Sequence, residues 1–303
     1  AQVAAMSTAQ IAAIETVDFA KISTAALSGL TAEQSAKLTT DQIVALTTAQ
    51  ASQLSATSSG ALTSAQVAAL ETGDLANLST DAIQALTTSA LAGLSAANQV
   101  AKLTTTQIGA LSSAQISSLS TAQVTALVTA QTNKLSSDQI SALTTAQLVA
   151  MTTAGVAALT TNAISIITTA QAAKLTTAQI VALTTAQAAA LSTDTLSALS
   201  SAQVAAFETA DLAQVTTAAM AAISTAALAG LSTAQISKLG TSQVSGLTSD
   251  QVAVLSTANV NALTTTQVSN LTSGQLAALT SAQAKAIGTA QMAALGTAQI
   301  NKL

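Results

Sequence analysis

The sequence predicts an all-α solenoid made of very short helices, one helix for each eight-residue repeat. Three observations support this fold class. Units with the consensus A-Q-I-A-A-L-T-T follow one another through the 303-residue chain, large apolar residues recur at positions 3 and 6, and charges are sorted by unit position. A unit of this size cannot bury its apolar face alone, so successive units must stack on one another.

The repeat keeps its register over the whole chain. Twelve octads cover residues 1–96, one nine-residue unit covers 97–105, twenty-four octads cover 106–297, and a six-residue remainder closes the chain. Position 6 is large and apolar in all 38 units, and position 3 in 31 of them. We therefore expect a single continuous solenoid over residues 1–303. The nine-residue unit should form a local bulge that keeps Val100 and Leu103 in the core, with no domain boundary there.

The spacing of the apolar positions decides between helix and strand. A continuous α-helix turns about 100° per residue, so a period of eight would spread these positions around its circumference. The same arithmetic excludes a heptad coiled coil. Strands need apolar residues two apart, whereas here they are three and then five apart. Three is a helical spacing and five leaves room for a turn. A β-solenoid is the alternative, favoured by the Thr, Ile and Val content.

The Ser and Thr residues at positions 7 and 8 predict helix N-caps. With position 7 as the cap, Gln at position 2 completes an S/T-x-x-Q capping box. We expect position 8 to be the cap instead, because position 7 also accepts residues such as Val128, Gly240 and Glu15. A glycine at position 7 would suit the end of the preceding helix.

The charged residues follow the polarity of the predicted helices. Nine of the 12 acids stand at positions 1 and 2, and seven of the 8 lysines stand at position 5. Acids favour helix N-termini and cations favour C-termini. We interpret these charges as dipole complements on a solvated face. Because acids already occur at position 2, replacing Gln179 with Asp is expected to be nearly silent.

Composition excludes most chemistry. The chain has no His, Cys, Trp, Tyr, Pro or Arg, and its net charge is −4. Without His or Cys, the many hydroxyls have no base beside them, and no redox or zinc motif is possible. An acidic chain with scattered lysines and two aromatic residues does not suit nucleic acid. We expect no enzyme activity, no cofactor and no nucleic-acid partner. Polar residues interrupt every apolar run, so no transmembrane span is expected.

One recurrent motif is a weak candidate for calcium. The pattern E-T-x-D occurs three times and supplies the carboxylate pairs Glu15/Asp18, Glu71/Asp74 and Glu208/Asp211. Calcium takes six to eight oxygen ligands, and two carboxylates fall short of that number. The favoured interpretation is a Glu in the turn and an Asp in the first helical turn, each assisting a cap. We expect no metal site.

Units such as A-Q-I-V-A-L-T-T-A-Q and A-Q-V-A-A-L-E-T-G-D-L-A-N-L-S-T resemble the octapeptide tandem-repeat tracts of very large bacterial secreted or cell-surface proteins. The resemblance covers the whole chain. It implies a bacterial, extracellular, adhesin-like or fibre-forming role, and it brings no catalytic residues with it.

The predicted function follows from the predicted architecture. The chain starts and stops without a divergent polar capping unit, and uncapped solenoid ends invite continuation. We expect a structural protein of an extracellular filament or adhesin stalk. Its partner would be itself, through head-to-tail stacking or as part of a longer chain. The alternative is an ice- or surface-binding protein with a regular Ser/Thr array. A protein-binding scaffold is a third possibility, although the exposed aromatic and Arg residues typical of binding faces are missing.

Overall fold

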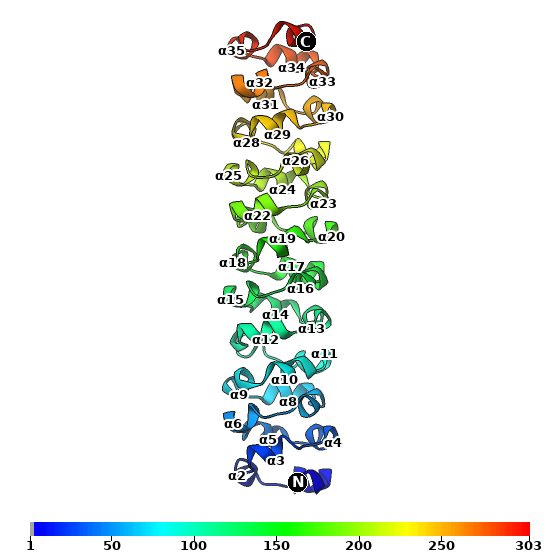
Figure 1. Cartoon of the computed structure of the whole chain (residues 1–303), viewed down its shortest axis with the longest axis vertical. Helices are drawn as coiled ribbons and strands as arrows, with labels where there is room; N and C mark the ends of the chain where they lie inside the picture. Colours follow the sequence, from blue (N-terminus) through cyan, green and yellow to red (C-terminus); the bar gives the residue numbers. More distant parts are fainter. Residues whose placement is uncertain (1–2) are drawn as a thin grey trace. The chain divides into compact units, whose positions relative to one another are not determined.

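In the computed structural model, which describes residues 3–303, the chain is built from short helices joined by sharp turns (Figure 1). It divides into two compact units, Ala1–Leu159 and Thr160–Leu303. The described part of the chain contains no strand, so the all-α prediction is confirmed and the β-solenoid alternative is wrong. Ala1 and Gln2 of the predicted 1–303 solenoid lie outside the described residues, and the single-domain assignment stays a prediction.

The helices have four to six residues, apart from two 3-10 turns of three. Those of the first unit are η1 Val3–Ala5, α1 Thr8–Ala12, α2 Thr16–Phe19, α3 Thr24–Leu27, α4 Ala32–Ala36, α5 Thr40–Val44, α6 Thr48–Ala51, α7 Ala56–Gly60, α8 Ser64–Ala69, α9 Thr72–Asn77, α10 Thr80–Ala85, α11 Thr88–Leu91, η2 Val100–Lys102, α12 Thr105–Ala110, α13 Ser113–Ser118, α14 Thr121–Thr125, α15 Thr129–Thr132, α16 Ser137–Ala142, α17 Thr145–Ala150 and α18 Thr153–Ala157. Those of the second unit are α19 Thr161–Ser165, α20 Thr169–Ala172, α21 Thr177–Val181, α22 Thr185–Ala190, α23 Thr193–Ser197, α24 Ser201–Ala206, α25 Thr209–Leu212, α26 Thr217–Ala222, α27 Thr225–Leu228, α28 Thr233–Lys238, α29 Thr241–Ser245, α30 Ser249–Ala253, α31 Thr257–Ala262, α32 Thr265–Ser269, α33 Ser273–Ala277, α34 Ser281–Ala286, α35 Thr289–Ala293 and α36 Thr297–Ile300.

Each unit is a stack of coils. A helix packs against the helix three further along the chain, as α13 does with α16 and α23 with α26 (Figure 1). Hydrogen bonds from position 2 reach the repeat four before, as from Gln139 to Ile108. A repeat therefore touches both its third and its fourth predecessor, so one coil takes between three and four repeats. Such helices are far too short to be stable alone, and stacking supplies what helix propensity cannot.

The helix caps differ from the prediction. The N-cap is at position 7, and position 8 is the first helical residue. In α21, for example, the Thr176 hydroxyl accepts from the Gln179 backbone N–H at 3.1 Å, and Gln179 Oε1 accepts from the Thr176 N–H at 3.0 Å. This is the S/T-x-x-Q capping box. Where position 7 is Val128 or Gly240, the Gln half of the box remains, which explains why position 7 tolerates them.

The helix ends also depart from expectation. No residue in the described chain has a positive φ, so no glycine supplies a left-handed C-cap. Instead the position 6 residue adopts an extended conformation, as Leu143 does at φ −59° and ψ 134°, and turns the chain into the next N-cap. Gly240, expected to suit the end of a helix, begins one at φ −64°. The nine acids at positions 1 and 2 do lie in first helical turns, as predicted.

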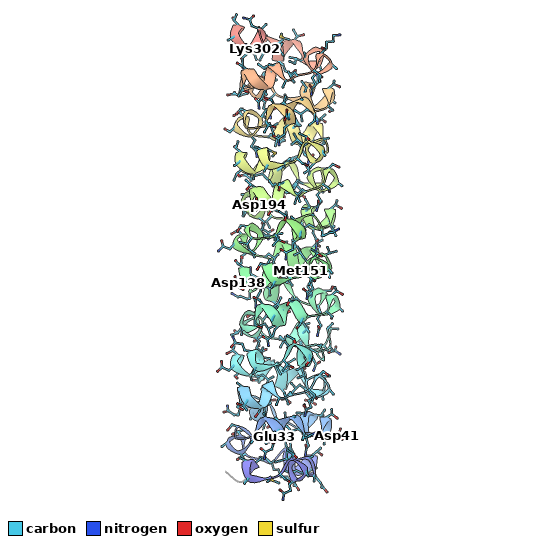
Figure 2. All side chains as sticks on the ribbon, turned by 90° about the vertical axis from the view of Figure 1, so that its right-hand side faces the viewer. Glu33, Asp41, Asp138, Met151, Asp194 and Lys302 are labelled. Atoms are coloured by element: carbon cyan, nitrogen blue, oxygen red, sulfur yellow. The ribbon has the colours of Figure 1, made fainter. Side chains whose placement is uncertain are left out.

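Positions 3 and 6 form the core of both units. Ile43 and Leu46 in the first unit and Ile180 and Leu183 in the second are all at most 5% exposed. Met151, labelled in Figure 2, is 3% exposed, while the labelled acids Asp138 and Asp194 are exposed. The predicted inward face is confirmed. None of the helices among residues 3–303 is long and apolar enough to cross a membrane.

Two glycines are required by close approach between coils. A Cβ added to Gly93 would overlap the carbonyl oxygen of Ser64, and one added to Gly230 would overlap that of Ser201. Both glycines are the fourth residue of the motif A-L-A-G-L and stand at position 5 of the repeat. The motif therefore marks places where a turn presses on the backbone of an earlier coil.

Candidate functional site

The repeated polar contact of this molecule is made by the glutamine at position 2. In α13 the amide nitrogen of Gln115 donates to the carbonyls of Ile83, Gln84 and Leu86 at 3.1, 3.1 and 2.8 Å. Its amide oxygen accepts from the Ser112 N–H at 2.8 Å. The side chain is 3% exposed. One buried amide thus caps its own helix and also binds the end of a helix in the preceding coil. We call this arrangement the glutamine clamp.

The clamp supplies hydrogen-bond donors to helix-end carbonyls that a short helix cannot pair by itself. The last carbonyls of any helix have no partner within it, and in a helix of five residues these carbonyls are most of the helix. Burying them between coils without partners would cost about 1–3 kcal/mol each. A glutamine from the next coil reaches the carbonyls at positions 3 and 6, and in some units also position 4, as Gln147 does with Ile116, Ser117 and Leu119.

The clamp recurs in both units. In these residues the amide nitrogen donates to carbonyls of an earlier coil: Gln34, Gln42, Gln50, Gln66, Gln99, Gln107, Gln115, Gln123, Gln131, Gln139, Gln147, Gln203, Gln235, Gln243, Gln251, Gln267, Gln275, Gln283, Gln291 and Gln299. The sequence analysis missed this role. Gln179 is 2% exposed, so a solvated setting for this side chain is wrong, while the nearly silent Gln179→Asp replacement stays a prediction. The preference for Gln at position 2, in 25 of the 38 repeats, was the available signal, since a solvated site would accept other polar residues as often.

Shorter side chains at position 2 keep only one of these bonds. Asn259 donates through Nδ2 to the Leu231 carbonyl at 2.9 Å, Ser58 donates to Leu30 at 3.2 Å, and Thr195 donates to Ile167 at 3.2 Å. In each pair the acceptor lies 28 residues earlier, at position 6. The carbonyl at position 6 is therefore the acceptor that every length of donor reaches.

The three E-T-x-D motifs place their aspartates at the same position 2. Asp74 is 2% exposed and Asp211 is 3% exposed, and Oδ2 of each has no hydrogen-bond partner. Burial raises the pKa of Asp74, with a further increase from Glu71 and an opposing hydrogen bond from the Thr48 side chain. Asp18 is exposed and pairs with Lys21 at 3.2 Å.

The glutamates of these motifs do not cap their helices as expected. Glu15, Glu71 and Glu208 are the N-cap residues of α2, α9 and α25, and none makes a side-chain cap bond. Among residues 3–303, no group of three or more acidic side chains comes close enough to hold a metal ion. The three carboxylate pairs lie in three separate helices, and we assign no metal ligand to them.

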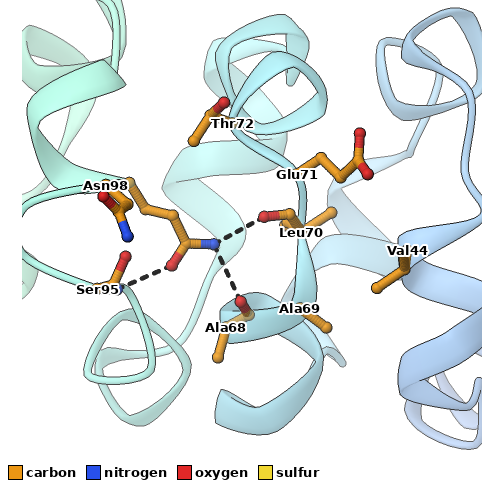
Figure 3. A pocket seen from close by; sticks show the side chains of 9 residues that line it. Val44, Ala68, Ala69, Leu70, Glu71, Thr72, Ser95 and Asn98 are labelled. Carbon is orange, nitrogen blue, oxygen red and sulfur yellow. Dashed lines mark hydrogen bonds between the residues drawn. The ribbon is translucent and has the colours of Figure 1, made fainter.

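The nine-residue unit opens a small pocket in the first unit. It has a volume of about 430 Å³ and is lined by Val44, Ala68, Ala69, Leu70, Glu71, Thr72, Ser95, Asn98 and Gln99. The extra residue replaces the α-helix with η2, yet Gln99 still clamps Ala68 and Leu70 at 3.2 and 2.8 Å (Figure 3). Val100 and Leu103 stay buried, as predicted. The bulge therefore changes the local path of the chain and keeps the register.

Comparison with known families supports the same repeat. The ALTTAQ repeat matches eight segments, residues 11–48, 67–105, 100–137, 140–177, 204–241, 220–257, 252–281 and 268–303. A comparison with curated proteins finds no match. The family matches together span well over half of the chain and include helices of both units. The chain belongs to the ALTTAQ repeat family.

Proposed function

We propose that this chain is a structural tract of an extracellular bacterial filament or adhesin stalk, which extends by continued stacking of its coils. The observation that carries the proposal is the repetition of the glutamine clamp. Where position 2 is Gln, a coil offers its amides to the preceding coil and receives them at the same carbonyl positions, in both units. Such a contact joins two different faces, so it is head-to-tail and does not close on itself.

The surface chemistry is consistent with a structural role. Only 7% of the residues are charged, against roughly 25% in an average soluble domain. Charge repulsion between neighbouring tracts is correspondingly weak. With no His, Cys or Arg, the chain lacks an imidazole base, a thiol nucleophile and a bidentate anion clamp. We propose no enzyme activity, and we place the protein outside the cell or on its surface.

The arrangement of the hydroxyls speaks against the alternative of an ice- or surface-binding array. A flat array would need position 8 residues of successive coils to stand directly above one another. Each repeat touches both its third and its fourth predecessor, so equivalent hydroxyls are staggered from coil to coil within a unit. We therefore favour the structural role.

Electron microscopy of the purified polypeptide tests the proposal. We expect fibres that lengthen with protein concentration. The matched control is the same polypeptide with one polar capping repeat fused at each end, because solenoids need such caps to stay discrete. The capped protein should give short particles of uniform length. Discrete monomers of the uncapped polypeptide at all concentrations, with sedimentation unaffected by the caps, would refute self-stacking.

A further inference from the structure

Two buried residues at position 2, one an amide and the other a carboxylic acid, have side chains of the same shape in equivalent places of two repeats. Asn259 and Asp74 both stand at the N3 position of their helices, both are at most 3% exposed, and they differ only in an amide nitrogen against an oxygen. Asn259 donates to the Leu231 carbonyl, 28 residues earlier. By the same register the acceptor opposite Asp74 is the carbonyl of Leu46. An ionised carboxylate has no hydrogen to donate there.

The surroundings of Asp74 do not supply a donor for both of its oxygens. The Thr48 hydroxyl of α6 hydrogen-bonds to the carboxyl, while Oδ2 has no partner. A buried carboxylate oxygen opposite a carbonyl is unfavourable, because two negative partial charges face each other without a proton between them. Adding a proton to Oδ2 turns this pair into an O–H···O hydrogen bond of the kind that Asn259 already makes with nitrogen.

The charges near Asp74 do not compensate it. Its own N-cap residue is Glu71, and Asp41 lies in α5, just before the Leu46 turn. Among the elements that pack closely on α9, α6 contains no titratable residue and η2 contains Lys102. No ion pair joins Lys102 to Asp74 in the described chain. Burial is the largest cause of the raised pKa of Asp74, and Glu71 adds to it.

We propose that Asp74 is a proton-dependent joint between coils: its protonated carboxyl donates to the Leu46 carbonyl and completes the contact, and loss of that proton to solvent opens it. A glutamine at this position would bind the preceding coil at any pH. The Asp74 carboxyl makes the equivalent contact only while it is protonated. Asp211 in the second unit has the same buried placement at N3.

The sign of the effect follows from linkage. The pKa of Asp74 lies above its ordinary value of 3.8 in the folded chain, so the folded state holds this proton more tightly than the unfolded state. The stability that the joint contributes is therefore complete below about pH 3.8 and is lost as the pH rises through the folded-state pKa. The usual surface carboxylate gives the opposite trend.

Hydrogen exchange of the full chain tests the joint at pH 3.5 and 7.5, corrected for intrinsic exchange rates. Asp74→Asn should protect the α9 amides above wild type at pH 7.5, by roughly tenfold per unit of pKa elevation, and match wild type at pH 3.5. Asn259→Asp should create the same pH dependence in α31, losing protection only at pH 7.5. Asp138→Asn, on the exposed surface, is the control and should change neither.

Two results would overturn the proposal. One is an Asp74→Asn effect of equal size at both pH values, or no effect at either. The other is protection of wild-type α9 at pH 7.5 by calcium chloride that Asp74→Asn abolishes, because the carboxylate would then bind a cation in place of a proton. Asp74→Gln restores the consensus clamp, and it should match or exceed the protection of Asp74→Asn at pH 7.5.

Discussion

The side-chain amide of Gln147 donates to the carbonyl of Leu119 at 2.6 Å, across 28 residues of sequence. The same nitrogen reaches the carbonyls of Ile116 and Ser117, and the amide oxygen caps its own helix through the Thr144 N–H. A single buried side chain thus links two coils and fixes their register. Where position 2 is Gln, the amide group therefore supplies both the cap and the contact between coils.

Replacing Gln147 with Glu should destabilise the surrounding coils by about 2–4 kcal/mol at neutral pH. The side chain keeps its length, but a carboxylate then faces three carbonyl oxygens without a hydrogen to share. Gln53→Glu is the matched control, since Gln53 is exposed at position 5, and it should change stability by less than about 0.5 kcal/mol. Urea unfolding followed by circular dichroism measures both. Equal losses in the two variants would contradict the clamp.

The core prediction uses a second matched pair. Leu183→Asp should cost several kcal/mol, because it puts an unpaired charge in place of a core side chain that is 4% exposed. Val181→Asp, two residues away at a side chain that is 47% exposed, should be almost neutral. Both variants are compared by thermal unfolding. If Val181→Asp were as damaging as Leu183→Asp, the inward face would be assigned to the wrong positions.

The sequence was sufficient for the fold class, the eight-residue register and the core, because spacing and apolar character determine which face turns inward. It was not sufficient for the polar contacts. Position 8 was expected to be the N-cap because position 7 can be Gly240 or Val128, which have no side-chain hydroxyl. The structure shows why position 7 can still be the cap: the side chain of the Gln at N3 accepts a hydrogen bond from the N-cap backbone N–H, whatever the residue there. The partner of Gln115 lies in a coil 29 to 32 residues away, and only the number of repeats in each coil brings it close.

The candidate site shows the same limit more sharply. The E-T-x-D motif reads as two carboxylates near a helix start, which is correct for Asp74. Its burial, and the absence of a donor for Oδ2, depend on the coil below. The spacing of residues along the chain does not show whether another coil covers the side chain at position 2. The expectation that Asp74 lies on a solvated face was therefore wrong.

Glycine substitutions should separate close approach from backbone freedom. Gly93→Ala should destabilise the first unit by about 1–3 kcal/mol, because its Cβ would overlap the Ser64 carbonyl and force the coils apart. Gly73→Ala, in the first turn of α9, meets nothing within 4 Å and should stabilise by about 0.5–1 kcal/mol through a less flexible unfolded chain. Chemical denaturation gives both values. A stabilising effect of Gly93→Ala would contradict this prediction, because the backbone at Ser64 would then move aside at little cost.

Removing one whole repeat should leave a folded solenoid. Deletion of residues 114–121 takes out one octad, including Gln115, and joins Ser113 to Ala122 in register. Gln123 then replaces Gln115 opposite Ile83 and Leu86. Gln131 and Gln139, whose bonds also span the deletion, take acceptors one repeat earlier, and clamps that lie wholly after it, such as that of Gln203, keep their partners. The stability of such a stack is a sum of repeat and interface terms. The free energy of unfolding should therefore fall by the contribution of one repeat, and the helical circular dichroism per residue should stay unchanged.

Deletion of residues 114–118 alone is the control for that experiment. It removes five residues, so the glutamines whose bonds span the cut, Gln123, Gln131 and Gln139, would face the wrong carbonyls. Positions 3 and 6 of the repeats around the cut would then leave the core. We expect hydrogen exchange to show lost protection on both sides of the cut, where the octad deletion keeps it. If the two deletions behaved alike, the coils would be held by nonspecific apolar packing, and the registered contact between position 2 and the carbonyls at positions 3 and 6 would not be what aligns them.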